Sequence, residues 1–235
     1  ADAWRAMAAN TRRAELKTGR NCTIYVDLGG PKIRTDHVRV PNDEYRVTVG
    51  DRVAFSEQLG SDASCSVEFT CTVPMLTRAL KVGEPVWIND GHIGCVVAER
   101  GDHGVVLSVT RARSSGEKIK AEKGLNFPGV DLSLAALTEK DVADLTEVVP
   151  FANVIGMSFV RRPEDVVSLQ DALAHVMPDA HRMPLALKIE TADAVRNLPD
   201  LIVAAARRNP TAVMIARGDL AGMRSWTGAT RSFAW

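Results

Sequence analysis

Short apolar segments that alternate with helical patterns constrain the fold of this chain more than any other feature of its sequence. Residues 154–160, 185–189 and 212–216 are three such segments, and an earlier apolar run covers residues 22–26. A helical pattern, residues 198–208, lies between the last two segments. Near-continuous apolar strands that alternate with helices are typical of a parallel sheet covered on both faces. The sequence therefore predicts an α/β fold built on a parallel sheet.

Three helix ends can be read directly from local signals. Thr138 is suited to cap a helix that begins after it, with Asp141 in place of the usual Glu of a capping box. Pro163 fits the first position of another helix, where its missing N–H is not needed. The pattern of residues 2–17 predicts an amphipathic helix, which Gly19 ends.

Residues 32–126 have a different character. Segments rich in β-branched residues alternate there with Gly, Asp, Asn and Ser clusters, and no strong helical period is present. The pair Asp90-Gly91 stands between two apolar runs, which predicts a hairpin with a two-residue loop. These residues are expected to form a small β domain inserted between parts of the α/β fold.

Polar residues follow or end the predicted parallel strands. They are Asp27, Ser158, Lys188, Glu190 and Asp219. Ligands of parallel α/β folds bind at the carboxyl ends of the strands, and two carboxylates with water can hold Mg²⁺. Lys188 and Glu190 are two residues apart, so in a strand both point to the same face. A simple ion pair at a strand end, with Asp219 as a helix cap, is the alternative interpretation.

Composition excludes several classes of function. Lys and Arg number 29, as do Asp and Glu, so the net charge is zero and a nucleic-acid surface is not expected. No apolar run reaches the roughly 18 residues of a membrane span. The four cysteines have no metal-ligand spacing and are expected to be reduced thiols, which favours a cytoplasmic protein. Neither a Walker A motif nor a dinucleotide glycine fingerprint is present.

Four separated motifs resemble the pyruvate kinase family in order and spacing. They are residues 27–35 (DLGGPKIRT), 123–131 (KGLNFPGVD), 187–190 (LKIE) and 216–220 (ARGDL). The resemblance implies a partial (β/α)8 TIM barrel with an inserted small β-barrel lid domain. It assigns residues 1–31 and 127–235 to the catalytic barrel, and residues 32–126 to the lid.

The resemblance also implies an activity, the transfer of a phosphoryl group between phosphoenolpyruvate and ADP to give pyruvate and ATP in glycolysis. Glu190 and Asp219 match the family's ligands of Mg²⁺ or Mn²⁺. Lys188 matches the catalytic lysine that stabilises the transferring phosphoryl group and the enolate. The amides of Gly218 and Asp219 match those that bind the substrate carboxylate.

Three residues of the inserted domain match positions that face the nucleotide phosphates in the family: Arg34, Asp90 and Lys123. Asp27 matches a ligand of the family's monovalent cation, but Lys32 stands where K⁺-dependent members carry Glu. A built-in ammonium group can supply the missing positive charge. We therefore expect the activity to be independent of K⁺.

By this resemblance the chain holds about half a barrel, four of eight strands, so we expect it to be a fragment that is inactive alone, from a parent that forms a homo-oligomer. Residues 221–235 follow no pattern of the family. Two other functions stay open. One is a magnesium-dependent aldolase or lyase of the related phosphoenolpyruvate-type barrels, which the glycine motif and the insertion disfavour. The other is a non-catalytic relative that binds a phospho-ligand or a partner chain.

Overall fold

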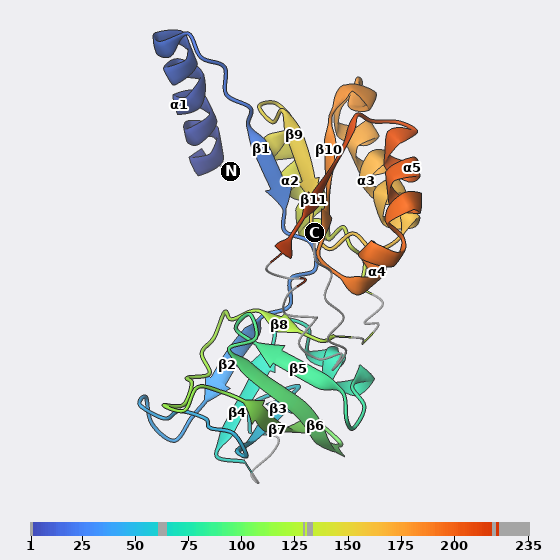
Figure 1. Cartoon of the computed structure of the whole chain (residues 1–235). Helices are drawn as coiled ribbons and strands as arrows, with labels where there is room; N and C mark the ends of the chain where they lie inside the picture. The colour runs from blue at the N-terminus through green and yellow to red at the C-terminus, as the bar shows by residue number, and fades with distance from the viewer. Residues whose placement is uncertain (1, 61–64, 129, 131–133, 218–219, 221–235) are drawn as a thin grey trace. The chain divides into compact units, whose positions relative to one another are not determined.

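The structure, a computed structural model, describes residues 2–60, 65–128, 130, 134–217 and 220 of the chain. The described residues form two compact units, shown in Figure 1. One is an α/β unit within residues 1–31 and 134–221, and the other is a β unit within residues 32–133. The predicted fold class is confirmed: the chain is a partial (β/α)8 barrel with an inserted β-barrel domain.

The α/β unit contains four strands and the larger helices of the chain. Its elements are α1 (Asp2–Thr18), β1 (Tyr25–Leu28), α2 (Glu139–Val148), β9 (Val154–Met157), α3 (Pro163–Val176), the short helix η2 (Ala180–Arg182), β10 (Leu185–Ile189), α4 (Ala192–Arg196), α5 (Leu198–Ala206) and β11 (Thr211–Ile215). The strands lie in the order β1-β9-β10-β11, and all neighbouring pairs are parallel. The predicted caps are present, since Thr138 and Asp141 form a capping box on α2 and Pro163 begins α3.

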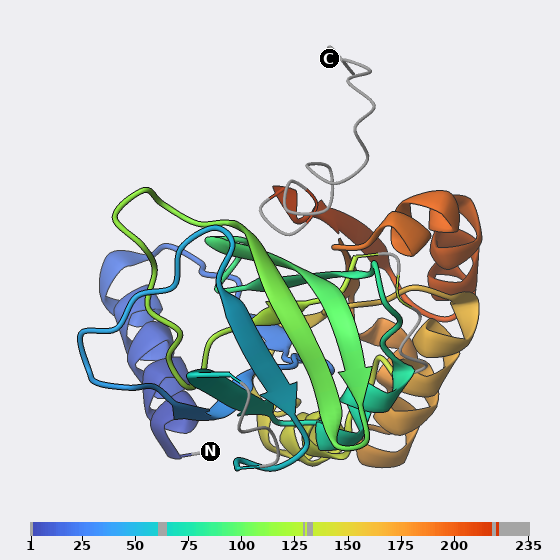
Figure 2. The ribbon, with the colours of Figure 1, turned by 90° about the horizontal axis from the view of Figure 1, so that it is seen from below.

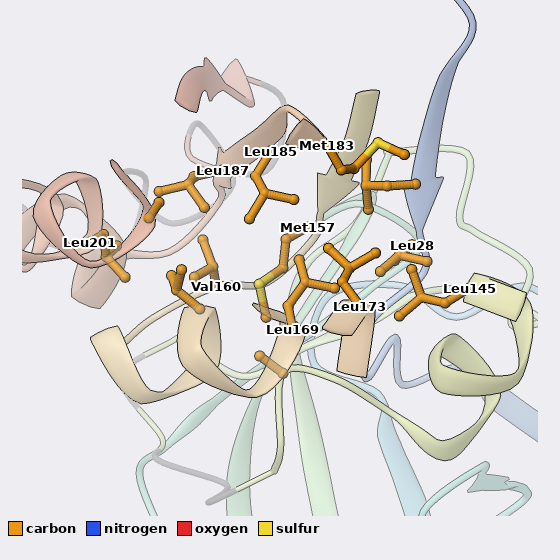
Figure 3. Close-up of a cluster of buried hydrophobic side chains, with 14 of the residues drawn as sticks. Leu28, Leu145, Met157, Val160, Leu169, Leu173, Met183, Leu185, Leu187 and Leu201 are labelled. Carbon is orange, nitrogen blue, oxygen red and sulfur yellow. The ribbon is translucent and has the colours of Figure 1, made fainter. Parts of the chain in front are cut away.

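The helices α2, α3 and α5 pack against one face of this sheet. Figure 3 shows the leucine-rich cluster of buried side chains that the strands and these helices form together. Every second residue of each strand points into the cluster, among them Leu28, Met157 and Leu187. The residues between them point to the opposite face of the sheet, called here the inner face. That face carries charged groups, so the expectation of a sheet covered by helices on both faces is wrong for the described residues.

The first strand begins later than predicted, at Tyr25 instead of Cys22. Side chains from elsewhere take up the backbone donors of the preceding residues. The N–H of Cys22 donates to Glu15 at 2.6 Å, and the N–H of Ile24 donates to Asn153 Oδ1 at 2.8 Å. The strand also ends later than predicted, at Leu28, so Asp27 lies inside it and is paired in register with Gly156.

The predicted helix of residues 2–17 is present as α1, but few of its side chains are covered. Ala8 is its buried residue, while Met7 and Leu16 are exposed. Arg12 attaches the helix to the unit through a 2.7 Å hydrogen bond to Asn153 Oδ1. None of the described helices is both long and apolar enough to cross a membrane.

The β unit is a seven-stranded sheet in the order β2-β4-β3-β7-β6-β5-β8. Its elements are β2 (Thr35–Arg39), β3 (Arg52–Ser56), β4 (Val67–Cys71), the short helix η1 (Pro74–Ala79), β5 (Pro85–Ile88), β6 (Ile93–Gly101), β7 (Gly104–Arg111) and β8 (Leu125–Asn126). Neighbouring strands are antiparallel except β3 and β4. Figure 2 shows the long green strands β6 and β7 side by side. Phe55 and Phe69 stack in the core of the β unit, with their ring centroids 4.7 Å apart.

The turn between β5 and β6 is centred on Asp90 and Gly91, as predicted, but four residues separate the strands instead of two. Both central residues have positive φ, and His92 donates its N–H to the Asn89 carbonyl at 3.0 Å. Asn89 also has a positive φ of 56°, which takes it out of the extended conformation and ends the strand at Ile88.

Candidate active site

The ammonium group of Lys188 lies at the centre of a polar cluster on the inner face. Its Nζ is 3.2 Å from Asp27 Oδ2 and 3.0 Å from Glu190 Oε1. The same nitrogen donates a hydrogen bond of 3.0 Å to Ser158 Oγ. The four residues come from β1, from the end of β9 and from β10 with the residue after it. The structure therefore brings together polar groups that the strand-end argument predicted to meet.

The charge on Lys188 is favoured by its surroundings. Burial of the side chain opposes the charge, but the hydrogen bonds and charges of Glu190 and Asp27 outweigh that effect, and the pKa of Lys188 is raised above its ordinary value. The amine is therefore an ammonium ion at neutral pH. It forms a fixed positive charge between two carboxylates, one within β1 and one directly after β10.

Glu190 is the most enclosed carboxylate of the cluster, with a side chain only 4% exposed. Its Oε2 accepts a hydrogen bond of 2.7 Å from the backbone N–H of Phe159. Its Oε1 faces Lys188. The amide and the ammonium group thus fix both oxygens, which limits the orientations that the carboxylate can adopt.

Tyr25 belongs to the same face and was not predicted. An ideal Cβ on Gly156 would lie 2.1 Å from the Tyr25 hydroxyl oxygen and 2.3 Å from Asp27 Oδ1, so both atoms occupy the space above this glycine. The hydroxyl also lies 3.8 Å from Met214 Sδ in β11. Burial raises the pKa of the Tyr25 phenol, and the charge and hydrogen bond of Asp27 and the charge of Glu190 add to the rise. The phenol is therefore protonated and able to donate.

Two sequence signals point to this contact. Tyr25 lies two residues before Asp27, which places both side chains on one face of the strand. Gly156 stands inside an apolar strand, where glycine often marks the close approach of another group. Neither signal says that the two segments are neighbours, since that depends on the order of the strands.

One carboxylate of the cluster suits a divalent metal ion. Glu190 is buried, is held in place through Oε2 and is chemically a hard oxygen donor, as Mg²⁺ and Mn²⁺ prefer. Within the described part of the chain, no three His, Cys, Asp or Glu side chains are grouped so that they could hold a metal ion. The second predicted ligand, Asp219, and the predicted substrate contact Gly218 lie outside the described residues.

The other predicted residues belong to the β unit. Arg34 forms a bridge with Gly124, and its guanidinium donates to the Glu122 carbonyl at 2.8 Å. An ideal Cβ on Gly124 would lie 3.6 Å from Asp90 Oδ1 and 3.8 Å from Lys32 Cε, so these two side chains flank the glycine.

Lys123 is anchored beside them through its backbone. Its N–H donates to Thr35 Oγ1 at 2.8 Å, and its carbonyl accepts from the Thr35 N–H at 2.8 Å. Arg34, Asp90, Lys123 and Lys32 therefore lie within the β unit, whereas Asp27, Lys188 and Glu190 lie together within the α/β unit.

Comparison with known proteins gives one consistent result. The family model described as the barrel domain of pyruvate kinase matches residues 2–224. The pyruvate kinase of Geobacillus stearothermophilus is 34% identical to this chain over 220 residues, which cover 90% of the chain and 34% of that relative.

Two further relatives have the same description. The pyruvate kinase of Corynebacterium glutamicum is 33% identical over 218 residues, covering 89% of this chain and 41% of the relative. That of Mycobacterium tuberculosis strain H37Rv is 31% identical over 211 residues, again 89% of this chain and 41% of the relative. The chain therefore spans between 34% and 41% of the length of these curated relatives.

Proposed function

This chain belongs to the pyruvate kinase barrel-domain family, and on that premise we propose that it is part of an enzyme that transfers the phosphoryl group of phosphoenolpyruvate to ADP, giving pyruvate and ATP. The observation that carries the proposal is the position of Lys188 Nζ, within 3.2 Å of oxygens from Asp27, Glu190 and Ser158. A fixed cation at the carboxyl ends of parallel strands is suited to an anionic substrate.

The role of Lys188 follows from the chemistry of phosphoryl transfer. The transition state is loose, and the protein contributes mainly position and neutralisation of charge. An ammonium ion whose pKa is raised does not give up its proton at neutral pH, so it acts as a fixed charge rather than as a base. We assign it to the phosphoryl oxygens and to the negative charge that develops on the enolate oxygen.

Glu190 and Asp219 would hold Mg²⁺ or Mn²⁺. The metal ion, when bound, supplies Lewis-acid stabilisation of the negative oxygens of the substrate. Glu190 is prepared for this role by the Phe159 amide, and Ser158 helps to orient Lys188. The backbone amides of Gly218 and Asp219 are proposed to bind the carboxylate of the substrate.

The two compact units take separate parts in this proposal. The α/β unit is proposed to be the partial catalytic barrel, and the β unit the lid. The sequence assigns residues 1–31 and 127–235 to the barrel and residues 32–126 to the lid, whereas the two compact units divide at residues 31/32 and 133/134. In the lid, Arg34 and Lys123 would neutralise the phosphates of ADP or ATP, with Asp90 beside them. Closure of a lid excludes water that would otherwise hydrolyse the phosphoryl donor.

The proposal includes a cytoplasmic setting for a full-length parent enzyme that is a homo-oligomer. Support for the setting comes from the cysteines: all four are thiols, and buried Cys71 and Cys95 make no disulfide. Thiols of this kind are typical of a reducing compartment.

A coupled assay of pyruvate formation tests the proposal on the full-length protein that contains this chain. We expect turnover that requires Mg²⁺ or Mn²⁺, and we expect the substitution Lys188→Met to abolish it while Lys140→Met, on an exposed lysine, leaves it intact. Metal-dependent binding of phosphoenolpyruvate without turnover would instead support a non-catalytic relative. The 235-residue chain alone is expected to be inactive, and measurable turnover by it would contradict the prediction that it is an incomplete catalytic unit.

A further inference from the structure

The backbone of Phe159 has a conformation that a bulky residue rarely adopts. Its φ is +55°, in the left-handed region, and it comes two residues after the end of β9. Left-handed backbone at a large side chain is unfavourable and persists only where the surrounding structure imposes it. Such residues concentrate at functional sites, and this one lies beside Ser158 and Glu190 of the polar cluster.

The unusual backbone directs one N–H group into the site. The Phe159 amide donates to Glu190 Oε2 at 2.7 Å, while Oε1 of the same carboxylate faces Lys188 at 3.0 Å. Because the Glu190 side chain is 4% exposed, water has little access to replace a lost donor. The amide therefore holds the carboxylate in one orientation, with its second oxygen toward Lys188.

The bend after β1 supports the bend after β9. Gly30 has a φ of +64°, and an ideal Cβ on it would lie 3.0 Å from Phe159 Cδ2 and 3.1 Å from the Ser158 carbonyl oxygen. The two turns are thus in close contact, with no room for a side chain at Gly30. The Gly30 N–H also donates a hydrogen bond of 3.3 Å to Oδ1 of Asp141, which is the third residue of α2 and part of its capping box.

We propose that Phe159 is a positioning residue for Glu190, and that its left-handed backbone, held in place by Gly30, aims an amide at the carboxylate so that Glu190 is prepared to bind a divalent metal ion. The inference rests on the proposed function in one respect, because it takes Glu190 as a metal ligand. The inference adds that the backbone conformation at residue 159, and not its aromatic ring, orients the Glu190 carboxylate.

Two substitutions of similar size separate backbone from side chain. Asn tolerates the left-handed region, whereas β-branched Val strongly disfavours it. We expect Phe159→Asn to keep the affinity of the purified chain for Mn²⁺, and Phe159→Val to weaken it about tenfold, as is typical when a group supporting a metal ligand is lost. Mn²⁺ binding is measured by electron paramagnetic resonance of the free ion, and circular dichroism confirms that each variant is folded.

Reference variants make each outcome decisive. Glu190→Gln should abolish Mn²⁺ binding, which would establish that the measured Mn²⁺ binds at Glu190. If Phe159→Val does not fold, Gly30→Ala takes its place, because its Cβ would press on the Ser158 carbonyl and displace the same turn. Equal affinities for the Asn and Val variants, both folded, would overturn the inference while leaving Glu190 as a ligand. A wild-type chain that binds no Mn²⁺ would overturn the metal role in the proposed function, and this inference with it.

Discussion

The hydroxyl oxygen of Tyr25 occupies the space above the α-carbon of Gly156, 2.1 Å from the point where a β-carbon would lie. The same point is 2.3 Å from Asp27 Oδ1. The glycine in β9 therefore makes room for two side chains of β1, one of which is a partner of Lys188. A large residue in one strand is matched by the smallest residue in its neighbour.

This match predicts that Gly156→Ala destabilises the chain. The added methyl group must displace Tyr25 or Asp27, and overpacking of this kind costs about 1–3 kcal/mol of unfolding free energy. The loss should be smaller in the background of Tyr25→Ala, where part of the space is vacated. A double-mutant cycle by urea unfolding measures the coupling, expected to be on the order of 1 kcal/mol.

The control for this cycle is Gly101→Ala in β6, where the nearest atom to an added Cβ is 3.9 Å away. That substitution should change the stability little. Additive effects of Gly156→Ala and Tyr25→Ala would show that the contact between them is not energetically significant.

Features that depend on neighbouring residues could be predicted from the sequence. The capping box of Thr138 and Asp141 and the proline that begins α3 are local signals, and both are present. The strand Leu185–Ile189 was predicted with its observed bounds, because its apolar run is bounded by Pro184 and Glu190.

Features that depend on distant segments could not be predicted in this way. The first strand is shortened because Glu15 and Asn153 take up donors of residues 22 and 24. The contact of Tyr25 with Gly156 depends on the pairing of β1 with β9. The left-handed backbone at Phe159 has no signal in its own sequence, because only glycine or asparagine would indicate it.

Removal of the charge at Lys188 should be costly to stability as well as to activity. In Lys188→Met, Asp27 and Glu190 lose the cation between them, and Glu190 is left buried with a single amide donor. Breaking a buried pair in this way costs about 3 kcal/mol, measured by urea unfolding at neutral pH.

The matched control is Lys140→Met, which removes an exposed lysine paired with Asp144 on α2 and should cost less than about 1 kcal/mol. Equal losses of unfolding free energy in Lys188→Met and Lys140→Met would show that the charge of Lys188 does not stabilise the polar cluster on the inner face.

Buried thiols predict a loss of stability in alkaline solution. Burial raises the pKa of the Cys95 thiol from its ordinary value of 9.0 to about 12. Because the pKa is higher in the folded state, the contribution of the protonated thiol to the free energy of unfolding is complete below pH 9.0 and is lost as the pH rises from there toward 12. Between pH 8 and pH 10 this thiol lowers the free energy of unfolding by about 1.4 kcal/mol.

Urea unfolding at several pH values measures this effect. Cys95→Ala should show a flatter dependence on pH than the wild type, although a small cavity lowers its stability at every pH. Cys22→Ala, at an exposed position, should keep the wild-type dependence. An unchanged slope in Cys95→Ala would contradict the prediction.

On the proposed function, Lys32 predicts that pyruvate formation by the full-length protein does not need a monovalent cation. The resemblance places Lys32 where K⁺-dependent members of the family carry Glu, and an ammonium group can take over the positive charge of the cation. We expect equal rates of pyruvate formation in K⁺ and in tetramethylammonium salts at the same ionic strength. Lys32→Glu should lose activity without K⁺ and regain it when K⁺ is added. The exposed Lys140→Glu serves as the control for a change of charge alone, and strong activation of the wild-type enzyme by K⁺ would refute the prediction.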